Sequence, residues 1–364
     1  MSSFVDVYYQ TEWKQKCPKD VHFLASWQGL ALFSHSMLIV FLPFYTFTAF
    51  CILCKTPKSM NSIKFVLLNS HLWCSYVDIM ICSLITPYFY FPTISGFPVG
   101  LLRVLEIPTS VQTYMGVVAS LFMGTSLVAL FENRSSCIPA NRFRITRKSS
   151  RFIYYSFFCT VYALYLAPAF LNMPDQTTAK MSLLNEISCP TEEFFYSDIF
   201  ILAVDDFWKS YLWMSTGIMV ASIFFQLGFF SVCCVYYLYI STAIMISSKT
   251  RKYQRSFFLG TIAQTFVPFT FIAIPVTTAI LSIYFKYYNQ VLNCAIVLVF
   301  SLHGFASTLV ILLVHHPYRC YLIRVITFDR SVEKHVSTGA SAVTRDVRAE
   351  MRRLSTRVHP ALPS

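Results

Sequence analysis

Charged residues are scarce in this sequence. They make up 13% of its 364 residues, against 55% hydrophobic residues, and the mean hydropathy is +0.55. A soluble chain of this length needs about a quarter of its residues charged to cover its surface. The shortage therefore excludes a soluble globular enzyme and leaves no room for a separate soluble domain.

Catalytic and metal-binding motifs are missing as well. The sequence holds no HExxH, GxSxG or P-loop motif, no pair of intramembrane carboxylates, and no CxxC…CxxC spacing among its 12 cysteines. We therefore expect no enzymatic activity, no cofactor and no metal site. The net charge of +12 does not indicate a nucleic-acid partner, because the basic residues stand in short clusters between apolar runs. Residues 1–26 also lack the apolar core of a cleavable signal peptide, so the first apolar run is expected to act as a signal anchor.

Long apolar runs are what the sequence does contain. A helix needs about 20 apolar residues to cross a hydrocarbon core roughly 30 Å thick, and seven runs are long enough. They cover residues 28–53, 65–90, 109–131, 152–171, 211–238, 257–284 and 291–314. An eighth, Ile199–Val204, is too short and is expected to belong to a folded outer loop. We predict an all-α, seven-transmembrane helix bundle, since barrel strands would show about ten residues of alternation.

Prolines within these runs predict kinks, because each removes a backbone donor. They are Pro43, Pro87, Pro168, Pro268 and Pro275. Pro268 and Pro275 share one face of the sixth span, which allows either a hinge or a static kink.

The basic residues predict the orientation. Three connecting loops, within 55–64, 134–151 and 249–255, hold thirteen Lys and Arg, whereas the loops of the other side hold four. Because short cytosolic loops are enriched in Lys and Arg, we expect the N-terminus outside and the C-terminus in the cytosol. Residues 1–26 would then be an extracellular segment, 27–326 the seven-helix domain with a short juxtamembrane helix, and 327–364 a disordered basic cytosolic tail. The sequon at Asn133 falls on the cytosolic side and is expected to stay unmodified.

Three passages carry a resemblance to a known family. They are Asn69-Ser70-His71-Leu72-Trp73 with Asp78, Pro87-Tyr88 and Phe91-Pro92; Phe131-Glu132-Asn133-Arg134; and His303-Gly304 with His315-His316-Pro317-Tyr318-Arg319. In this order and on these spans, residues from about Trp27 to Ile326 resemble the nematode serpentine chemoreceptors of class H. The resemblance implies a multi-pass G-protein-coupled receptor of the plasma membrane, in the cilium of a chemosensory neuron. Its partners would be the lipid bilayer, a small environmental ligand and a heterotrimeric G protein.

Asp78 lies near the middle of the second predicted span. A carboxylate costs about 2.5–3.5 kcal/mol there, so it needs a partner. His303 sits at a similar depth in the seventh span, and His71 shares a helix face with Asp78. We predict an Asp78–His303 contact, with His71 nearby, as an intramembrane polar switch. The alternative is a protonated Asp78 bonded to another polar group.

Glu132 and Arg134 end the third span, where rhodopsin-like receptors carry an acidic–Arg–Tyr triplet. Here Asn133 is inserted and the tyrosine is missing. Arg134 is then either a switch that pairs with the acid or with a neighbouring helix, or a stop-transfer cation. We predict that the G protein meets a cytosolic cleft lined by Glu132, Arg134, Lys249, Arg251, Lys252, Arg255 and Arg319. The alternative is a solvated rim that only follows the positive-inside rule.

A ligand pocket is expected in the outer half of the bundle. Five residues at that depth are candidates to line it: Gln112, Tyr114, Trp213, Thr277 and Asn293. Helix packing is the alternative for each, and an interfacial anchor is a further one for Trp213.

Cys17 and Cys189 are the two cysteines that this topology places outside the membrane and cytosol. We predict a disulfide between them that ties the N-terminal segment over the second outer loop; two free thiols are the alternative. Cys320, beside a short amphipathic helix, is a candidate for palmitoylation, and Ser355 in Arg352-Arg353-Leu354-Ser355 for phosphorylation.

Two other classes of membrane protein compete with a receptor. One is an odorant-gated cation channel of inverted topology, which the basic loops argue against. The other is a transporter, for which an internal repeat is expected and none is found.

Overall fold

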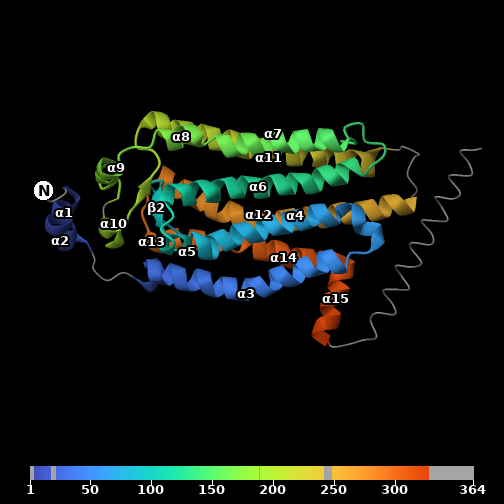
Figure 1. Cartoon of the computed structure of the whole chain (residues 1–364), viewed down its shortest axis with the longest axis horizontal. Helices are drawn as coiled ribbons and strands as arrows, with labels where there is room; N and C mark the ends of the chain where they lie inside the picture. The colour runs from blue at the N-terminus through green and yellow to red at the C-terminus, as the bar shows by residue number, and fades with distance from the viewer. Residues whose placement is uncertain (1–3, 18–21, 188, 242–247, 328–364) are drawn as a thin grey trace, which may run out of the picture.

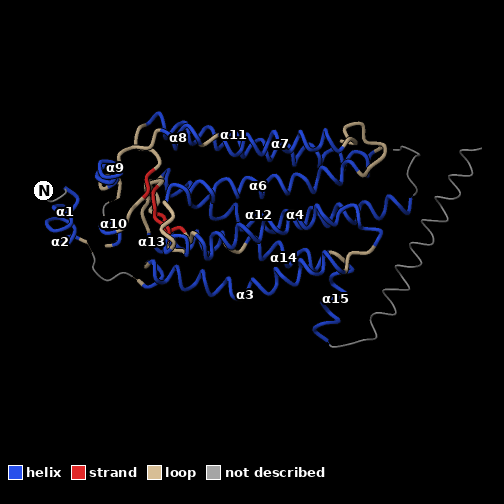
Figure 2. Tube along the Cα trace, in the orientation of Figure 1, coloured by secondary structure: helices blue, strands red, loops and turns tan. Residues whose placement is uncertain are grey.

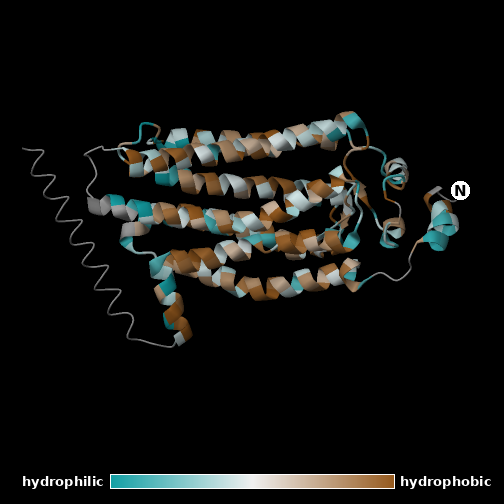
Figure 3. Ribbon diagram, turned by 180° about the vertical axis from the view of Figure 1, so that it is seen from behind, coloured by the Kyte–Doolittle hydropathy of each residue, from teal (hydrophilic) through white to brown (hydrophobic). Residues whose placement is uncertain are grey.

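The apolar runs form the long helices of one bundle. A computed structural model of the chain describes residues 4–17, 22–187, 189–241 and 248–327. Within these ranges seven helical segments are long and apolar enough to cross a membrane, which confirms the predicted seven-helix bundle. Figure 1 shows them running side by side, and Figure 3 shows hydrophobic residues along their middle lengths.

The seven segments are built from the following elements. They are α3 (Trp27–Cys54); α4 (Asn61–Ile79) with the π-helical turn η4 (Met80–Leu84); α6 (Thr109–Ser136); α7 (Lys148–Leu164) with α8 (Ala167–Leu171); α11 (Asp206–Val235) with the π-helical turn η5 (Tyr236–Ile240); α12 (Ser248–Tyr284); and α13 (Gln290–Phe300) with α14 (His303–Val314). Helix α4 packs against α3, α6 and α14, α6 packs against α7 and α11, and α12 packs against α13 and α14.

The second span is shorter than predicted. It ends at Leu84, because Thr86 turns the chain with a left-handed backbone (φ 43°) and Pro87 begins a strand instead of kinking a helix. Strand β1 (Pro87–Phe89) pairs antiparallel with β2 (Ser95–Pro98), and β2 pairs with β3 (Phe200–Ile201). The mostly helical fold therefore includes a small three-stranded sheet, order β1-β2-β3, and the short run Ile199–Val204 supplies its third strand.

The other four prolines of the predicted spans lie in helices. Pro43 is inside α3, and Pro268 and Pro275 are inside α12, where both are buried. Pro168 stands in the first turn of α8, where a proline needs no backbone donor.

Connecting segments build a folded cap at one end of the bundle (Figures 1 and 2). The cap consists of α1 (Phe4–Tyr8), η1 (Tyr9–Trp13), α2 (Lys14–Lys16), η2 (Phe23–Ala25), the sheet, α5 (Leu101–Val104), α9 (Gln176–Leu183) and α10 (Glu193–Tyr196). Its core contains Tyr88, Tyr90, Phe97 and Phe194. Only glycine fits at Gly96, because a Cβ would lie 2.4 Å from the carbonyl oxygen of Tyr88 on the neighbouring strand.

The opposite end of the bundle carries Lys55, Arg134, Arg151 and Arg255, and we call it the basic end. It includes the short turn η3 (Lys58–Met60) and the helix α15 (His316–Thr327), which turns away from α14 in Figure 1. Helix α15 is held against α3, since the Lys55 ammonium lies 4.5 Å from the ring centre of Tyr321.

Candidate functional site

Asp78 joins three helices inside the bundle. Its Oδ2 accepts hydrogen bonds from the Tyr45 hydroxyl of α3 and, at 2.9 Å, from the backbone N–H of Phe305 in α14. Its Oδ1 lies 2.9 Å from Nδ1 of His303. The carboxylate is fully buried, and these groups give it the partners that an intramembrane carboxylate needs.

A break in the seventh span creates this site. Helix α14 begins at His303, so the N–H groups of its first turn have no carbonyl within their own helix. Phe305 donates to Asp78 from this turn, and the helix dipole favours a carboxylate there. Gly304 lets the helices approach, because a Cβ would lie 2.5 Å from Oδ2 of Asp78 and 2.6 Å from the Cys74 carbonyl oxygen.

The structure places His303, but not His71, against Asp78. His303 Nδ1 also lies 2.8 Å from the carbonyl oxygen of Phe300, and two acceptors beside Nδ1 indicate that this nitrogen carries a proton. His71 instead lies with Nε2 at 3.0 Å from the carbonyl oxygen of Tyr45. Tyr45 therefore links His71 to Asp78, which in turn contacts His303. No local pattern singles out Tyr45, because a tyrosine in an apolar run resembles any other core residue.

Glu132 binds the fourth span. It is 1% exposed, and its Oε1 lies 2.8 Å from the guanidinium of Arg151 in α7. The same oxygen accepts a hydrogen bond from Ser136 at 2.6 Å, and Oε2 accepts one from the Tyr155 hydroxyl at 3.2 Å. Arg151, a partner that sequence reasoning missed, thus joins α7 to α6.

Arg134 faces the sixth helix instead. Its guanidinium lies 4.9 Å from the ring centre of Phe257 in α12. Its Nε and Nη2 are buried and have no hydrogen-bond acceptor among the described residues. Burial, and then the Arg134 charge, lower the pKa of the nearby His315 to about 4, so this histidine is neutral at neutral pH. Of the readings open at the sequence level, the geometry fits a contact with a neighbouring helix.

The arginines at the start of α12 hold the end of the fifth span. Arg255 donates through Nε and Nη2 to the carbonyl oxygen of Leu238, at 2.8 and 2.6 Å. Arg251 donates to the carbonyl oxygen of Ser241 at 3.1 Å. These bonds satisfy carbonyls that a helix end leaves open. Both guanidinium groups therefore brace η5, and their contact with a G protein stays a prediction.

Three basic residues remain among those predicted to face the G protein. Arg319 is exposed and donates to the carbonyl oxygen of Leu313 at 3.1 Å. Lys249 and Lys252 lie on α12, but their side chains fall outside what the structure describes.

The five predicted pocket residues lie in different surroundings in the described part of the chain. Gln112 is buried and donates to the carbonyl oxygen of Ile107 at 2.7 Å. The Tyr114 hydroxyl bonds to the carbonyl oxygen of Ala163 in α7, and Asn293 donates to that of Phe91 at 3.1 Å.

The other two of the five are exposed on their helices. Trp213 is 44% exposed on α11, and Thr277 is exposed on α12. Two cavities lie in the cap, and none of the five residues lines either of them. Three of the five residues are therefore engaged in contacts within the described part of the chain, two are exposed, and the ligand pocket stays a prediction.

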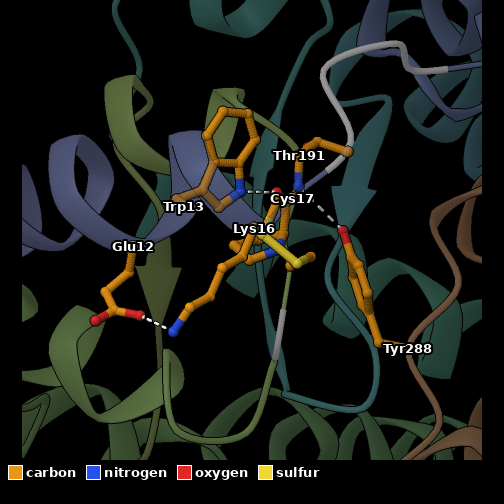
Figure 4. The surroundings of a disulfide bond; sticks show 8 residues. Glu12, Trp13, Lys16, Cys17, Thr191 and Tyr288 are labelled. Carbon is orange, nitrogen blue, oxygen red and sulfur yellow. Dashed lines mark hydrogen bonds and ion pairs between the residues drawn. A yellow bond between two sulfur atoms is a disulfide. The ribbon is translucent and has the colours of Figure 1, made fainter.

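A disulfide joins Cys17 to Cys189, at the positions where the sequence led us to expect one. Figure 4 shows the bond beside Trp13, whose indole N–H donates to the carbonyl oxygen of Pro190 at 2.8 Å. Tyr9 and Glu192 add a side-chain hydrogen bond between the same two segments. The N-terminal helices are therefore fastened to the loop between the fourth and fifth spans.

Thr191 ties this loop to three tyrosines of the cap. Its backbone N–H donates to the Tyr288 hydroxyl at 3.3 Å, as Figure 4 shows, and its hydroxyl lies 3.3 Å from those of Tyr88 and Tyr90. Burial raises the pKa of Tyr88, Tyr90 and Tyr288, so all three remain hydrogen-bond donors at neutral pH.

Of the two residues predicted to be modified, the structure describes only Cys320. Cys320 is half-buried on α15, with its sulfur 3.6 Å from Nε2 of His316. Ser355 lies outside the described residues.

A helix bundle of seven spans with a folded cap and a basic opposite end defines a multi-pass membrane protein. The family described as Serpentine type 7TM GPCR chemoreceptor Srh matches residues 25–328. Serpentine receptor class H-72 of Caenorhabditis elegans is 36% identical over 321 residues, which cover 87% of this chain and 91% of that protein. No solved structure matches the chain.

The chain therefore belongs to the Srh family of serpentine seven-transmembrane chemoreceptors. This is a receptor family and not an enzyme family, and the finding agrees with the resemblance seen in the three sequence passages.

Proposed function

We propose that this protein is a chemosensory receptor that binds a small environmental molecule on the side of the cap and signals to a heterotrimeric G protein at the basic end. In this proposal the cap faces the exterior, because the Lys and Arg of the connecting loops gather at the other end. The plasma membrane, at the cilium of a chemosensory neuron, is the location that family membership favours.

The proposal rests on half-buried Arg134, two of whose guanidinium nitrogens, Nε and Nη2, are buried without an acceptor among the described residues. Buried N–H groups that lack acceptors are held at a free-energy cost. Helix α12 covers it through Phe257. A displacement of α12 would free Arg134 to bind an acceptor from a cytosolic partner. Such a partner would favour the displaced arrangement because it binds that arrangement more tightly.

The Asp78 site is the proposed link between the two ends. It connects α3, α4 and the first turn of α14 through hydrogen bonds and the contact between Asp78 and His303 within the span. A ligand that shifts α14 at the cap would change these contacts. We propose that Asp78 then changes its contacts with His303 and Phe305 of α14, so the polar switch of the sequence prediction acts through helix position.

Nucleotide exchange on purified G proteins tests coupling. Membranes that contain the receptor are mixed with a panel of Gα subunits, and binding of a non-hydrolysable GTP analogue is measured with and without volatile and water-soluble chemicals. We expect exchange above receptor-free membranes for at least one subunit, and its loss in Arg134→Ala. Arg144→Ala, which changes an exposed arginine in the loop that follows α6, is the matched control and should retain coupling. Equal exchange in both variants would overturn the role of Arg134.

The lysines of the third basic loop need a separate test. Arg251 and Arg255 brace η5, so neutralising them would confound signalling with folding. Lys249→Gln with Lys252→Gln is the cleaner variant. We expect normal surface expression and reduced exchange; unchanged exchange would mean that these lysines form only a solvated rim.

A further inference from the structure

A half-open groove of about 580 Å³ lies in the cap, outside the part of the bundle where the sequence predicted a pocket. Separate parts of the chain form its wall, namely α1, the first turn of α6, α9 and the segment that leads into β3. Its volume is that of a small-molecule site, which typically occupies roughly 300–1,000 Å³. The chemistry of the wall therefore indicates what kind of molecule the groove can hold.

The charged groups of the wall are occupied by one another and by the backbone. The Lys180 ammonium interacts with the carboxylates of Asp6 and Asp198. It also donates to the carbonyl oxygens of Phe195 and Ser197, at 3.1 and 3.2 Å. The other residues that line the groove are uncharged. A charged ligand would have to break these contacts or enter without a partner, and burying an unpaired ion is costly. An uncharged ligand avoids both costs.

The uncharged polar part of the wall consists mainly of hydroxyl groups. Four side chains supply one each, and no described residue forms a hydrogen bond with them: Thr109, Ser110, Thr177 and Ser197. The amide of Gln176 is already engaged, because it bonds to the backbone N–H and carbonyl of Ile201 at 2.9 and 3.1 Å. A hydroxyl can donate or accept a hydrogen bond, so these four groups suit a carbonyl or hydroxyl oxygen of a ligand.

Contacts behind the wall fix its aromatic part. Phe195 lines the groove and packs against Tyr9 and Trp13, with ring centres 4.9 and 5.6 Å apart. Phe200 lines it from β3 and stacks on Phe170 at 6.0 Å. The disulfide holds the segment that carries Tyr9 and Trp13 in place. Because these rings are already ordered, a ligand that contacts them loses little entropy to arrange its site.

We propose that this groove binds an uncharged small molecule with an apolar body and a polar oxygen, such as an alcohol, a ketone or an ester. The apolar body would lie against Phe195 and Phe200, and the oxygen would bond to hydroxyls such as that of Ser110. The inference rests on the proposed receptor function and names its ligand class. Ser110 is in the first turn of α6, whose other end carries Glu132 and Arg134, so the ligand would touch the helix that reaches the basic end.

Cysteine accessibility tests the charge selectivity of the groove. Ser110→Cys is treated on intact cells with three methanethiosulfonates of matched length, which carry a hydroxyethyl, an aminoethyl or a sulfonatoethyl group. Each rate is divided by the rate of the same reagent with a simple thiol in solution. We expect the uncharged reagent to react at least about threefold faster than either charged one, because the groove offers an ion no free partner.

Two controls accompany these rates. Gln10→Cys, exposed on η1 and outside the lining of both cavities, should react with all three reagents and show no preference for the uncharged one. Wild-type receptor gives the background of its own thiols.

A second variant tests why the groove excludes ions. In Ser110→Cys with Lys180→Gln, the carboxylates of Asp6 and Asp198 lose their shared cation. We expect the aminoethyl reagent to become the fastest of the three, while the reaction at Gln10→Cys is unchanged by Lys180→Gln. An unchanged order of rates would overturn the charge argument. If Lys180→Gln prevents surface expression, the three rates of Ser110→Cys decide alone.

The attached hydroxyethyl group also acts as a tethered ligand, which separates the inference from the proposed function. A preference for the uncharged reagent together with nucleotide exchange supports both. The same preference without exchange, for any Gα subunit, keeps the groove and counts against G-protein coupling. The inference is overturned, even if the receptor signals, by a preference for either charged reagent, by equal rates for all three, or by no reaction at Ser110→Cys while Gln10→Cys reacts.

Discussion

Glu132 and Arg134 stand two residues apart at the end of α6 and bind different helices. Glu132 pairs with Arg151 of α7 at 2.8 Å, and Arg134 packs on Phe257 of α12 at 4.9 Å. One helix end is thus anchored on one side by an ion pair and covered on the other by an aromatic ring. A movement of α12 can uncover Arg134 while the ion pair to α7 stays intact.

The Glu132–Arg151 pair should contribute measurably to stability. Glu132 is buried and the Arg151 side chain is 35% exposed, so solvent screens the pair only in part. We expect a coupling of about 1–3 kcal/mol in a double-mutant cycle of Glu132→Gln and Arg151→Gln, measured by thermal unfolding in nanodiscs.

The Lys209–Glu186 pair is the control for this cycle. Its side chains are 37% and 43% exposed, and pairs of this kind couple by about 0–1 kcal/mol. If both cycles gave the same small coupling, the inner pair would be no more than a surface contact.

Gly304 should be intolerant of a single added methyl group. In Gly304→Ala the Cβ would meet the Asp78 carboxylate at 2.5 Å, so α14 would have to move from α4. We expect a loss of about 1–3 kcal/mol of stability, in line with other overpacked sites, and reduced surface expression. Gly217→Ala is the matched control, because a Cβ there has no heavy atom within 4 Å. It should be neutral or stabilise α11 by up to about 1 kcal/mol. Equal behaviour of the two variants would contradict the close packing at Asp78.

Removing either cysteine of the disulfide should destabilise the cap as much as removing both. Cys17→Ser, Cys189→Ser and the double variant are expected to destabilise the cap equally, by about 2–4 kcal/mol, because any one change breaks the bond. Limited proteolysis of residues 4–17 on intact cells gives the measurement. Cys137→Ser, an exposed free thiol at the basic end, should leave the cap unchanged. Additive losses from the two single variants would show that no bond joins them.

The sequence predicted these features to different degrees. Hydropathy predicted the seven spans well, since a run of apolar residues has few alternatives to a helix in a membrane. Hydropathy wrongly extended the second span beyond Leu84, because the residues of β1 are as apolar as those of a span. Charge scarcity singled out Asp78 and Glu132, but their partners Tyr45 and Arg151 depend on helix rotation, which no local pattern encodes. The cap was the least predictable part, because its cavity is made by loops whose pairing is set in three dimensions.

Acid should weaken the start of α9. Asp175 caps this helix by accepting from the Thr178 N–H and hydroxyl, both at 2.8 Å, and these bonds lower the pKa of Asp175. A lowered pKa in the folded state means that the cap stabilises α9 above about pH 4, the usual pKa of an aspartate, and is lost as the pH falls further. The measurement is the hydrogen-exchange rate of residues 177–183 in wild type divided by the rate in Asp175→Asn. We expect slower exchange in wild type at pH 7 and no difference between the two proteins near pH 3. A ratio that does not change with pH would exclude this capping role.

The orientation of the bundle decides between a receptor and an inverted channel. Epitope tags at each terminus, stained on intact and on permeabilised cells, should show the N-terminal tag on intact cells and the C-terminal tag only after permeabilisation. Glycosylation gives an independent reading. Gln10→Asn with Glu12→Thr creates a sequon on the exposed surface of η1 and should gain a glycan, whereas the sequon at Asn133, at the basic end, should stay unmodified. If the pattern is reversed, the basic clusters face the exterior, G-protein coupling at Arg134 becomes impossible, and ionic currents are the activity to record.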